Sequence, residues 1–284
     1  MITGNFEYHQ PSTLPEAVAL LSKLGDEARV IAGGHSLIPS MKLRLAMPEH
    51  LIDLQGINEL KNIQIGRGEV RIGAMATQAE LIGSDALFKA APIVRETSLQ
   101  IADPQVRYLG TIGGNVANGD PSNDMPGLMQ CLDATFVLQG PDGEREVKAR
   151  DFYEAAYFTA RDDLEILSAI RFSEYTGGYA YGKQKRKIGD YATAASAVLL
   201  TKDGDRCSHA SIALTNLADT PIYCEDASNI LQNDGVTDAS IAASVSSAMS
   251  LIDPVDDNRG PGVFKKHAAA IILASSIREA WARA

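Results

Sequence analysis

The sequence predicts an α+β protein with two domains, and three observations support this fold class. The chain has 284 residues, which is enough for two hydrophobic cores of ordinary size. Helical and strand patterns alternate in the first part, whereas three strand patterns followed only by helical patterns make up the rest. The change comes at Thr176-Gly177-Gly178. We therefore expect domains at residues 1–177 and 178–284, the first divided into subdomains 1–55 and 56–177.

The first subdomain is expected to be a small α/β unit. Thr13 and Glu16 have the spacing of a capping box, so a helix should follow, and Gly25 is placed to end it. A strand then runs directly into a Gly-Gly pair, and ligands bind at such strand ends in α/β units. The remaining elements are a strand at 29–32, a helix at 37–45 and a strand at 50–54.

The second subdomain begins with a hairpin, because apolar residues alternate over 63–74 around a Gly-Arg-Gly turn. Thr77 and Glu80 predict a second capping box and a helix. Residues 103–126 are rich in Gly, Asn, Asp and Pro, which predicts a long loop, and loops of that length are uncommon unless functional. The other expected elements are a helix at 93–102 and strands at 135–138 and 164–172.

The C-terminal domain is expected to be a three-stranded antiparallel sheet with helices packed on one side. An Asp-Gly-Asp turn separates the second and third strand patterns, and the chain beyond Pro221 has only helical patterns. The predicted strands are 179–187, 192–200 and 207–217, and the predicted helices are about 226–232, 239–251 and 265–284.

Composition excludes several classes of function. The net charge of -10 argues against a nucleic-acid-binding surface and against direct binding to anionic lipid. Cys131, Cys207 and Cys224 form no C-x-x-C pair, so we expect no iron–sulfur cluster, zinc or other metal in this chain. Sparse, odd-numbered thiols fit a reducing compartment. With no leader and no apolar stretch near the ~20 residues of a membrane span, we expect a cytoplasmic protein.

Two glycine clusters are the strongest functional signal. They are Ala32-Gly33-Gly34-His35-Ser36 and Thr111-Ile112-Gly113-Gly114-Asn115. A Gly-Gly pair permits positive φ and close approach to a ligand, and consecutive N–H groups in such turns can hold an anion. Two clusters could hold the two phosphates of one pyrophosphate, which predicts a dinucleotide site without the G-x-G-x-x-G loop of a Rossmann fold. The alternatives are a plain strand-to-helix turn for the first and a helix-initiating turn for the second.

Further polar and aromatic residues have both a functional and a structural interpretation. Asp124 could accept hydrogen bonds from ribityl or ribose hydroxyls, or could be an Asx-turn residue. A basic cluster could contact a cofactor phosphate or an acidic partner, or could belong to a solvent-exposed edge strand. It consists of Lys183, Lys185, Arg186 and Lys187. Tyr191 could stack on an aromatic cofactor, although half-buried tyrosines on strands are routine. His35 could donate to a phosphate, but it has no triad partner, so we interpret it as a structural or phosphate-contact histidine and not as a base. We expect no catalytic residue in the chain.

The two glycine motifs identify the chain as resembling the FAD-binding medium subunits of molybdenum hydroxylases, in particular those of aerobic carbon monoxide dehydrogenases. The stretches 101–108, 118–126 and 185–194 join these motifs in the resemblance, which covers essentially the whole chain. The family has the vanillyl-alcohol-oxidase/p-cresol-methylhydroxylase type of FAD domain, in two parts. The resemblance therefore implies that fold for residues 1–177.

The resemblance also implies site residues. Residues 32–36 and 111–115 would bind the FAD pyrophosphate through backbone N–H groups, and Asp124 would contact the cofactor. Leu167 matches an apolar residue near the flavin ring, Lys185 falls in the basic stretch that reaches the cofactor, and Tyr191 matches an aromatic residue that covers the isoalloxazine. FAD would be held non-covalently.

In this family the medium subunit works in a complex with a large and a small subunit. A large subunit with molybdopterin cytosine dinucleotide and a copper–molybdenum centre oxidises CO with water to CO2, and a small subunit carries two [2Fe–2S] clusters. FAD on the medium subunit would receive the electrons and pass them to a quinone or similar acceptor. The implied assembly is a dimer of heterotrimers that meets the cytoplasmic membrane only through its partners. The alternatives are the same subunit in a purine, N-heterocycle or aldehyde hydroxylase, a free-standing flavin oxidase, and a binding protein without flavin.

Overall fold

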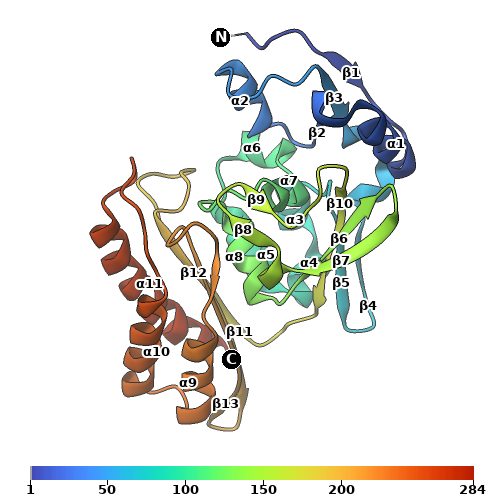
Figure 1. The fold of residues 1–284 in the computed structure, drawn as a ribbon. Helices are drawn as coiled ribbons and strands as arrows, with labels where there is room; N and C mark the ends of the chain where they lie inside the picture. Colours follow the sequence, from blue (N-terminus) through green and yellow to red (C-terminus); the bar gives the residue numbers. More distant parts are fainter. Residues whose placement is uncertain (1) are drawn as a thin grey trace.

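The computed structural model describes residues 2–284, which form three larger sheets and one two-stranded sheet, with helices between and around them (Figure 1). The N-terminal part is a parallel sheet in the order β1-β3-β2, which confirms the expected small α/β unit. Its elements are β1 (Glu7–His9), α1 (Leu14–Leu24), β2 (Ala28–Ile31), α2 (Leu37–Lys42) and β3 (His50–Asp53), with 3-10 turns at Gly25–Glu27, Leu54–Gly56 and Asn58–Lys61.

The middle of the chain forms a five-stranded antiparallel sheet in the order β4-β5-β10-β6-β7. Its strands are β4 (Ile63–Gly66), β5 (Glu69–Gly73), β6 (Thr135–Gly140), β7 (Gly143–Lys148) and β10 (Ile166–Ser173), and β8 (Tyr153–Ala155) pairs with β9 (Phe158–Thr159). The helices are α3 (Gln78–Gly83), α4 (Asp85–Ala90), α5 (Pro92–Gln100), α6 (Pro104–Leu109), α7 (Ile112–Ala117) and α8 (Asp124–Cys131), with a 3-10 turn at Ala149–Asp151.

The expectation of a long loop over residues 103–126 was wrong. The segment contains α6, α7 and the start of α8. Asp103 caps α6 by accepting the Val106 N–H at 3.0 Å, and Thr111 caps α7 by accepting the Gly114 N–H at 3.0 Å. Asp, Thr, Pro and Gly are the residues that begin short helices as well as those that make loops. Composition alone therefore did not distinguish a long loop from a series of short helices in this segment.

The two expected capping boxes differ. Thr77 and Glu80 form a complete box at the start of α3. Thr13 caps α1 through the Glu16 N–H, but the Glu16 carboxylate turns back to the backbone N–H of Ser12 instead of that of Thr13. The Glu16 side chain thus still satisfies a donor before the first turn of α1, one residue earlier than predicted.

The C-terminal part is an antiparallel sheet in the order β11-β12-β13-β14. The three long strands expected are present, and two-residue β14 extends the sheet. Figure 1 shows α9, α10 and α11 on the face away from the rest of the chain, while α5 and α8 contact the strands from the N-terminal side. The bounds are β11 (Gly178–Gln184), β12 (Ala194–Asp203), β13 (Arg206–Thr215), β14 (Ile222–Tyr223), α9 (Glu225–Asp234), α10 (Asp238–Ser250) and α11 (Gly262–Arg283).

Strand β12 joins the two large cores. Ala195, Ala197 and Leu199 pack in the core of the five-stranded sheet, and the alternate residues Val198 and Leu200 pack against the C-terminal helices. A strand buried on both faces carries a nearly continuous apolar run, and residues 194–200 of β12 form such a run, interrupted only by Ser196. Among residues 2–284, no helix combines the length and apolar character that crossing a membrane requires.

Candidate functional site

A cleft of about 530 Å³ lies where the parallel sheet, the five-stranded sheet and the loop after β11 meet. Most of the predicted site residues line it, and they come from segments far apart in the chain. They are Ala32, Gly33, Gly34, His35, Ser36, Thr111, Gly113, Gly114, Asn115, Asp124, Leu167 and Tyr191. The predicted residues Ile112 and Lys185 do not line it.

The first glycine motif offers the cleft a row of backbone donors. It follows the end of β2, and Gly34 has φ 73°, a conformation that glycine adopts without strain. Within the described part of the chain, the N–H groups of residues 33–36 have no hydrogen-bond acceptor. Because an unpaired N–H is costly when it is removed from water, these donors suit an anionic ligand.

The second glycine motif plays a different part. Thr111 begins α7, and the N–H groups of residues 112–115 already have acceptors within the chain. Ile112 is fully buried in the core. The helix-initiating interpretation therefore describes this segment, and its N–H groups do not form the anion-holding turn expected from the sequence. Its glycines instead permit close packing, since a Cβ added to Gly113 would lie 2.5 Å from the Cβ of Ala74.

The glycines bring the two motifs into contact. A Cβ added to Gly33 would lie 2.2 Å from the carbonyl oxygen of Leu109 and 2.8 Å from the Cα of Gly110. A Cβ on Gly114 would lie 3.5 Å from the Cβ of Ala32. At Gly33 only glycine allows the backbones to approach this closely, whereas 3.5 Å at Gly114 is an ordinary van der Waals contact. The two motifs therefore form one continuous wall of the cleft, as a ligand with adjacent phosphates requires.

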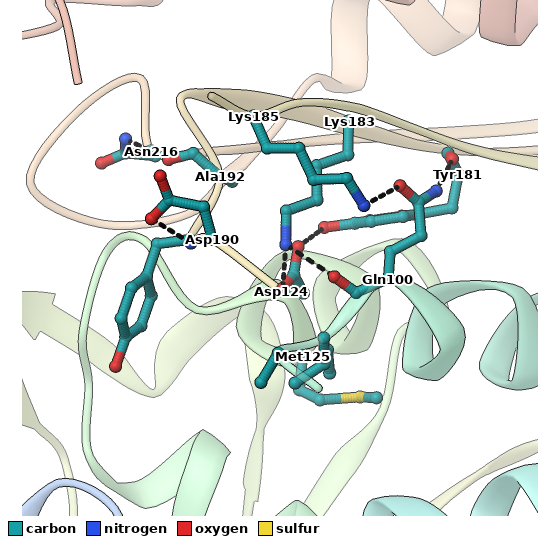
Figure 2. Close-up of polar contacts among 12 residues, drawn as sticks. Gln100, Asp124, Met125, Tyr181, Lys183, Lys185, Asp190, Ala192 and Asn216 are labelled. Atoms are coloured by element: carbon teal, nitrogen blue, oxygen red, sulfur yellow. Dashed lines mark hydrogen bonds and ion pairs between the residues drawn. The ribbon is translucent and has the colours of Figure 1, made fainter. Parts of the chain in front are cut away.

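Asp124 lies at the start of α8 and is buried against β11. Its Oδ1 accepts the Tyr181 hydroxyl at 2.6 Å, and its Oδ2 accepts the Lys183 ammonium at 2.8 Å (Figure 2). Burial raises the pKa of the Asp124 carboxyl above its usual value, and Lys183 and Tyr181 oppose this shift by donating to the charged form. Asp124 is thus held in place by the C-terminal sheet, in a helix and not in the predicted loop turn.

Lys183 was not singled out from its basic cluster, although it is the lysine that reaches Asp124. Tyr181 and Lys183 are two residues apart on β11 and so project from the same face of the strand, whereas Lys185 follows its last residue. Figure 2 shows Lys185 directed toward Gln100, and its Nζ lies 3.5 Å from the Gln100 Oε1. Burial lowers the pKa of Lys185, as does the nearby charge of Lys183. Lys185 does not line the cleft, and its contact with the cofactor stays a prediction.

An apolar residue and an aromatic residue line the cleft from opposite domains. Leu167 is buried in β10, next to an irregularity of the β10–β6 register between Leu167 and Ala169. Tyr191 lies in the loop after β11, is 43% exposed, and has the Arg259 guanidinium 5.2 Å from its ring centroid. Burial raises the pKa of Tyr191, so its hydroxyl stays neutral at physiological pH.

Two arginines that line the cleft were not predicted from the sequence. Arg29 on β2 and Arg161 before β10 both line it. Arg161 donates to the carbonyl oxygens of Asp162 at 2.7 Å and Glu165 at 2.8 Å, which fixes its guanidinium beside the cleft. Burial lowers the pKa of Arg161, and the nearby Arg29 acts in the same direction. Neither belongs to a motif, so only the fold brings these positive charges to one place.

Comparison with known proteins decides the family. Residues 4–173 match the family described as FAD binding domain in molybdopterin dehydrogenase. The chain belongs to this family of FAD-binding oxidoreductase subunits. Residues 179–280 match a second family, the CO dehydrogenase flavoprotein C-terminal domain. The cleft fits the FAD of this family, because free N–H donors, two arginines and glycine-dependent close packing meet at one wall.

Relatives in the family match the chain over its whole length. The carbon monoxide dehydrogenase medium chain of Afipia carboxidovorans is 54% identical over 286 residues, covering 100% of this chain and 99% of that protein. The carbon monoxide dehydrogenase medium chain of Hydrogenophaga pseudoflava is 44% identical with the same coverage. A crystal structure of cyanide-inactivated Cu,Mo-CO dehydrogenase contains a chain with a TM-score of 0.98, 54% identity and complete coverage of both chains.

Proposed function

We propose that this chain is the electron-transfer subunit of an aerobic carbon monoxide dehydrogenase. Electrons from the oxidation of CO and water to CO2, at a molybdenum–copper site on a large subunit, would reach it through the [2Fe–2S] clusters of a small subunit. A quinone or similar acceptor would then be reduced. Support comes from the likeness to two medium chains over their full length, at 54% and 44% identity. The single structural observation behind the proposal is the cleft wall built from both glycine motifs.

The chain's own residues bind and orient the cofactor in this proposal. Bound FAD supplies a carrier that takes up electrons singly and gives up one or two. The N–H groups of residues 33–36 would hold its pyrophosphate, assisted by Arg29 and Arg161. Leu167 and Tyr191 would contact the flavin ring from two sides. We assign no acid or base to the chain, because electron transfer is its task and the protons that accompany reduction of the flavin or of a quinone would come from solvent.

Asp124 would bind the hydroxyl-bearing part of the cofactor. Both of its oxygens accept from the protein, yet each carboxylate oxygen has a further lone pair to offer. Lys183 would keep the Asp124 carboxylate ionised despite its burial, and so preserve its strength as an acceptor. The orientation of Asp124 would thus depend on the C-terminal sheet, which couples the second domain to cofactor binding.

Partner subunits would cover the surface around the cleft. Leu99, Tyr108, Leu109 and Ile188 are 54%, 71%, 52% and 90% exposed, and they lie on segments that adjoin the cleft. Exposed apolar side chains gathered beside a functional site are typical of protein interfaces. We propose that the small and large subunits dock nearby in a dimer of heterotrimers. The assembly would lie in the cytoplasm, at the membrane only through its partners.

Anaerobic reduction by substrate tests the proposal. The chain is purified with its partner subunits, CO is added without oxygen, and the flavin and iron–sulfur absorption bands are followed. The account predicts that CO bleaches both the flavin and the iron–sulfur bands in the complex and does not bleach the flavin of the isolated chain. Flavin that is bleached by a purine, an N-heterocycle or an aldehyde, and not by CO, would assign the subunit to another molybdenum hydroxylase. Flavin that is bleached by an organic donor in the isolated chain would indicate a free-standing oxidase.

A further inference from the structure

Two histidines and a glutamate meet on the parallel sheet, far from the cofactor residues in sequence. Strand β1 lies beside β3 (Figure 1) and pairs with it in parallel, and Glu7 lies opposite His50 in this register. Glu7 and His9 are two residues apart on β1, so their side chains leave the same face of the strand. The intervening Tyr8 leaves the other face and hydrogen-bonds to Asp53. The alternation of β1 therefore places three potential ligands together.

The separation of these atoms is that of ligands around one ion. His9 Nε2 lies 3.1 Å from His50 Nδ1, and His50 Nδ1 lies 3.4 Å from a carboxylate oxygen of Glu7. One ligand atom from each residue falls within 4.8 Å of the other two. Tetrahedral zinc with bonds of about 2.0–2.1 Å to nitrogen requires ligand atoms roughly 3.3 Å apart. Small side-chain rotations would bring all three atoms onto one ion.

We propose that Glu7, His9 and His50 bind a divalent transition-metal ion of the zinc class, with water as the remaining ligand. Two imidazoles and one carboxylate are a ligand set that zinc uses, whereas calcium and magnesium take oxygen ligands. The Glu7 side chain is 75% exposed and that of His50 only 15%, so the ion would enter from solvent and be held against the sheet. The competing explanation is a metal-free hydrogen bond between the two rings.

A bound ion would stabilise the sheet that carries the first glycine motif. Strand β1 has three residues and lies at the edge, and β3 is the central strand that also pairs with β2. An ion shared by β1 and β3 would fasten the edge strand to the centre. Because ligands that bind only the folded state stabilise it by mass action, the effect should appear as a higher melting temperature.

Calorimetric titration of the chelator-treated full chain with ZnCl2 tests this site. The wild type should bind one equivalent of Zn2+, and His9→Gln and His50→Gln should bind it about 100-fold more weakly or not at all. His267→Gln is the matched control, because His267 is exposed on α11, away from this sheet, and it should bind as the wild type does. Circular dichroism verifies that each variant is folded.

Glu7→Gln tests the site even if the histidine variants fail to fold. The Glu7 side chain is mostly exposed, so this substitution leaves the core intact. It should weaken Zn2+ binding, and the rise in melting temperature with Zn2+ should disappear in all three ligand variants. Absence of Zn2+ binding by the wild type would overturn the proposal. So would binding that survives these three substitutions, because the ion would then lie elsewhere.

Discussion

Replacing Gly33 by alanine tests the idea that close backbone contact between the first glycine motif and residues 109–110, which directly precede the second motif, builds the cofactor site. The new Cβ would lie 2.2 Å from the Leu109 carbonyl oxygen and 2.8 Å from the Gly110 Cα. Both obstacles are backbone atoms, so a side-chain rotation cannot relieve the clash. Forcing an extra carbon into a packed site costs about 1–3 kcal/mol. If that cost falls on the FAD-bound state, affinity should drop about 5- to 150-fold.

The measurement is a titration of the flavin-free chain with FAD, followed by the quenching of flavin fluorescence, together with a thermal melt. Gly66→Ala is the matched control, because a Cβ at Gly66 meets nothing within 4 Å. It should change neither affinity nor melting temperature appreciably. Wild-type affinity and stability in Gly33→Ala would refute the reasoning, since the two motifs would then not depend on their contact. A loss of equal size in both variants would refute it as well.

Three further outcomes are expected. Lys183→Met should lower the free energy of unfolding in urea by about 3–5 kcal/mol at pH 8, because it leaves the Asp124 carboxylate buried and unpaired. The loss should shrink toward pH 5, since the raised pKa of Asp124 lets the folded state take up a proton there; an equal loss at both pH values would contradict this. Thr111→Ala should cost about 1 kcal/mol in the same assay through the lost cap of α7, and no change would remove the cap's role. Burial raises the pKa of Cys131 to about 12, so iodoacetamide at pH 8 should label it only after unfolding, and rapid labelling of the native chain would contradict its burial.

The features predicted well from the sequence depend on local chemistry. The glycine pairs stand out because close approach and positive φ demand glycine, as Gly33 and Gly34 show. The long strands β12 and β13 stand out because their apolar runs are bounded by turn residues. In each case the signal lies in adjacent residues, so no knowledge of the fold is needed to detect it.

The features that the sequence did not predict depend on distant partners. Strand β7 is mostly charged and exposed, and it is held as a strand by pairing with the buried β6. Lys183 lies on β11 and Lys185 just beyond its end, and only the position of α8 determines which of them reaches Asp124. The loop prediction over 103–126 was wrong for a local reason. The residues that cap short helices are of the same types as those that form loops, so composition does not distinguish the two.

The flavin content of the purified chain tests the central claim most directly. The chain is prepared alone and with its iron–sulfur partner, its visible spectrum is recorded, and the protein is then denatured and filtered. The account predicts flavin bands in the complex and one FAD per chain in the filtrate, because the cleft holds the cofactor through hydrogen bonds, charge and packing. Absence of flavin from both preparations would contradict the account, and so would flavin that remains attached to the denatured chain.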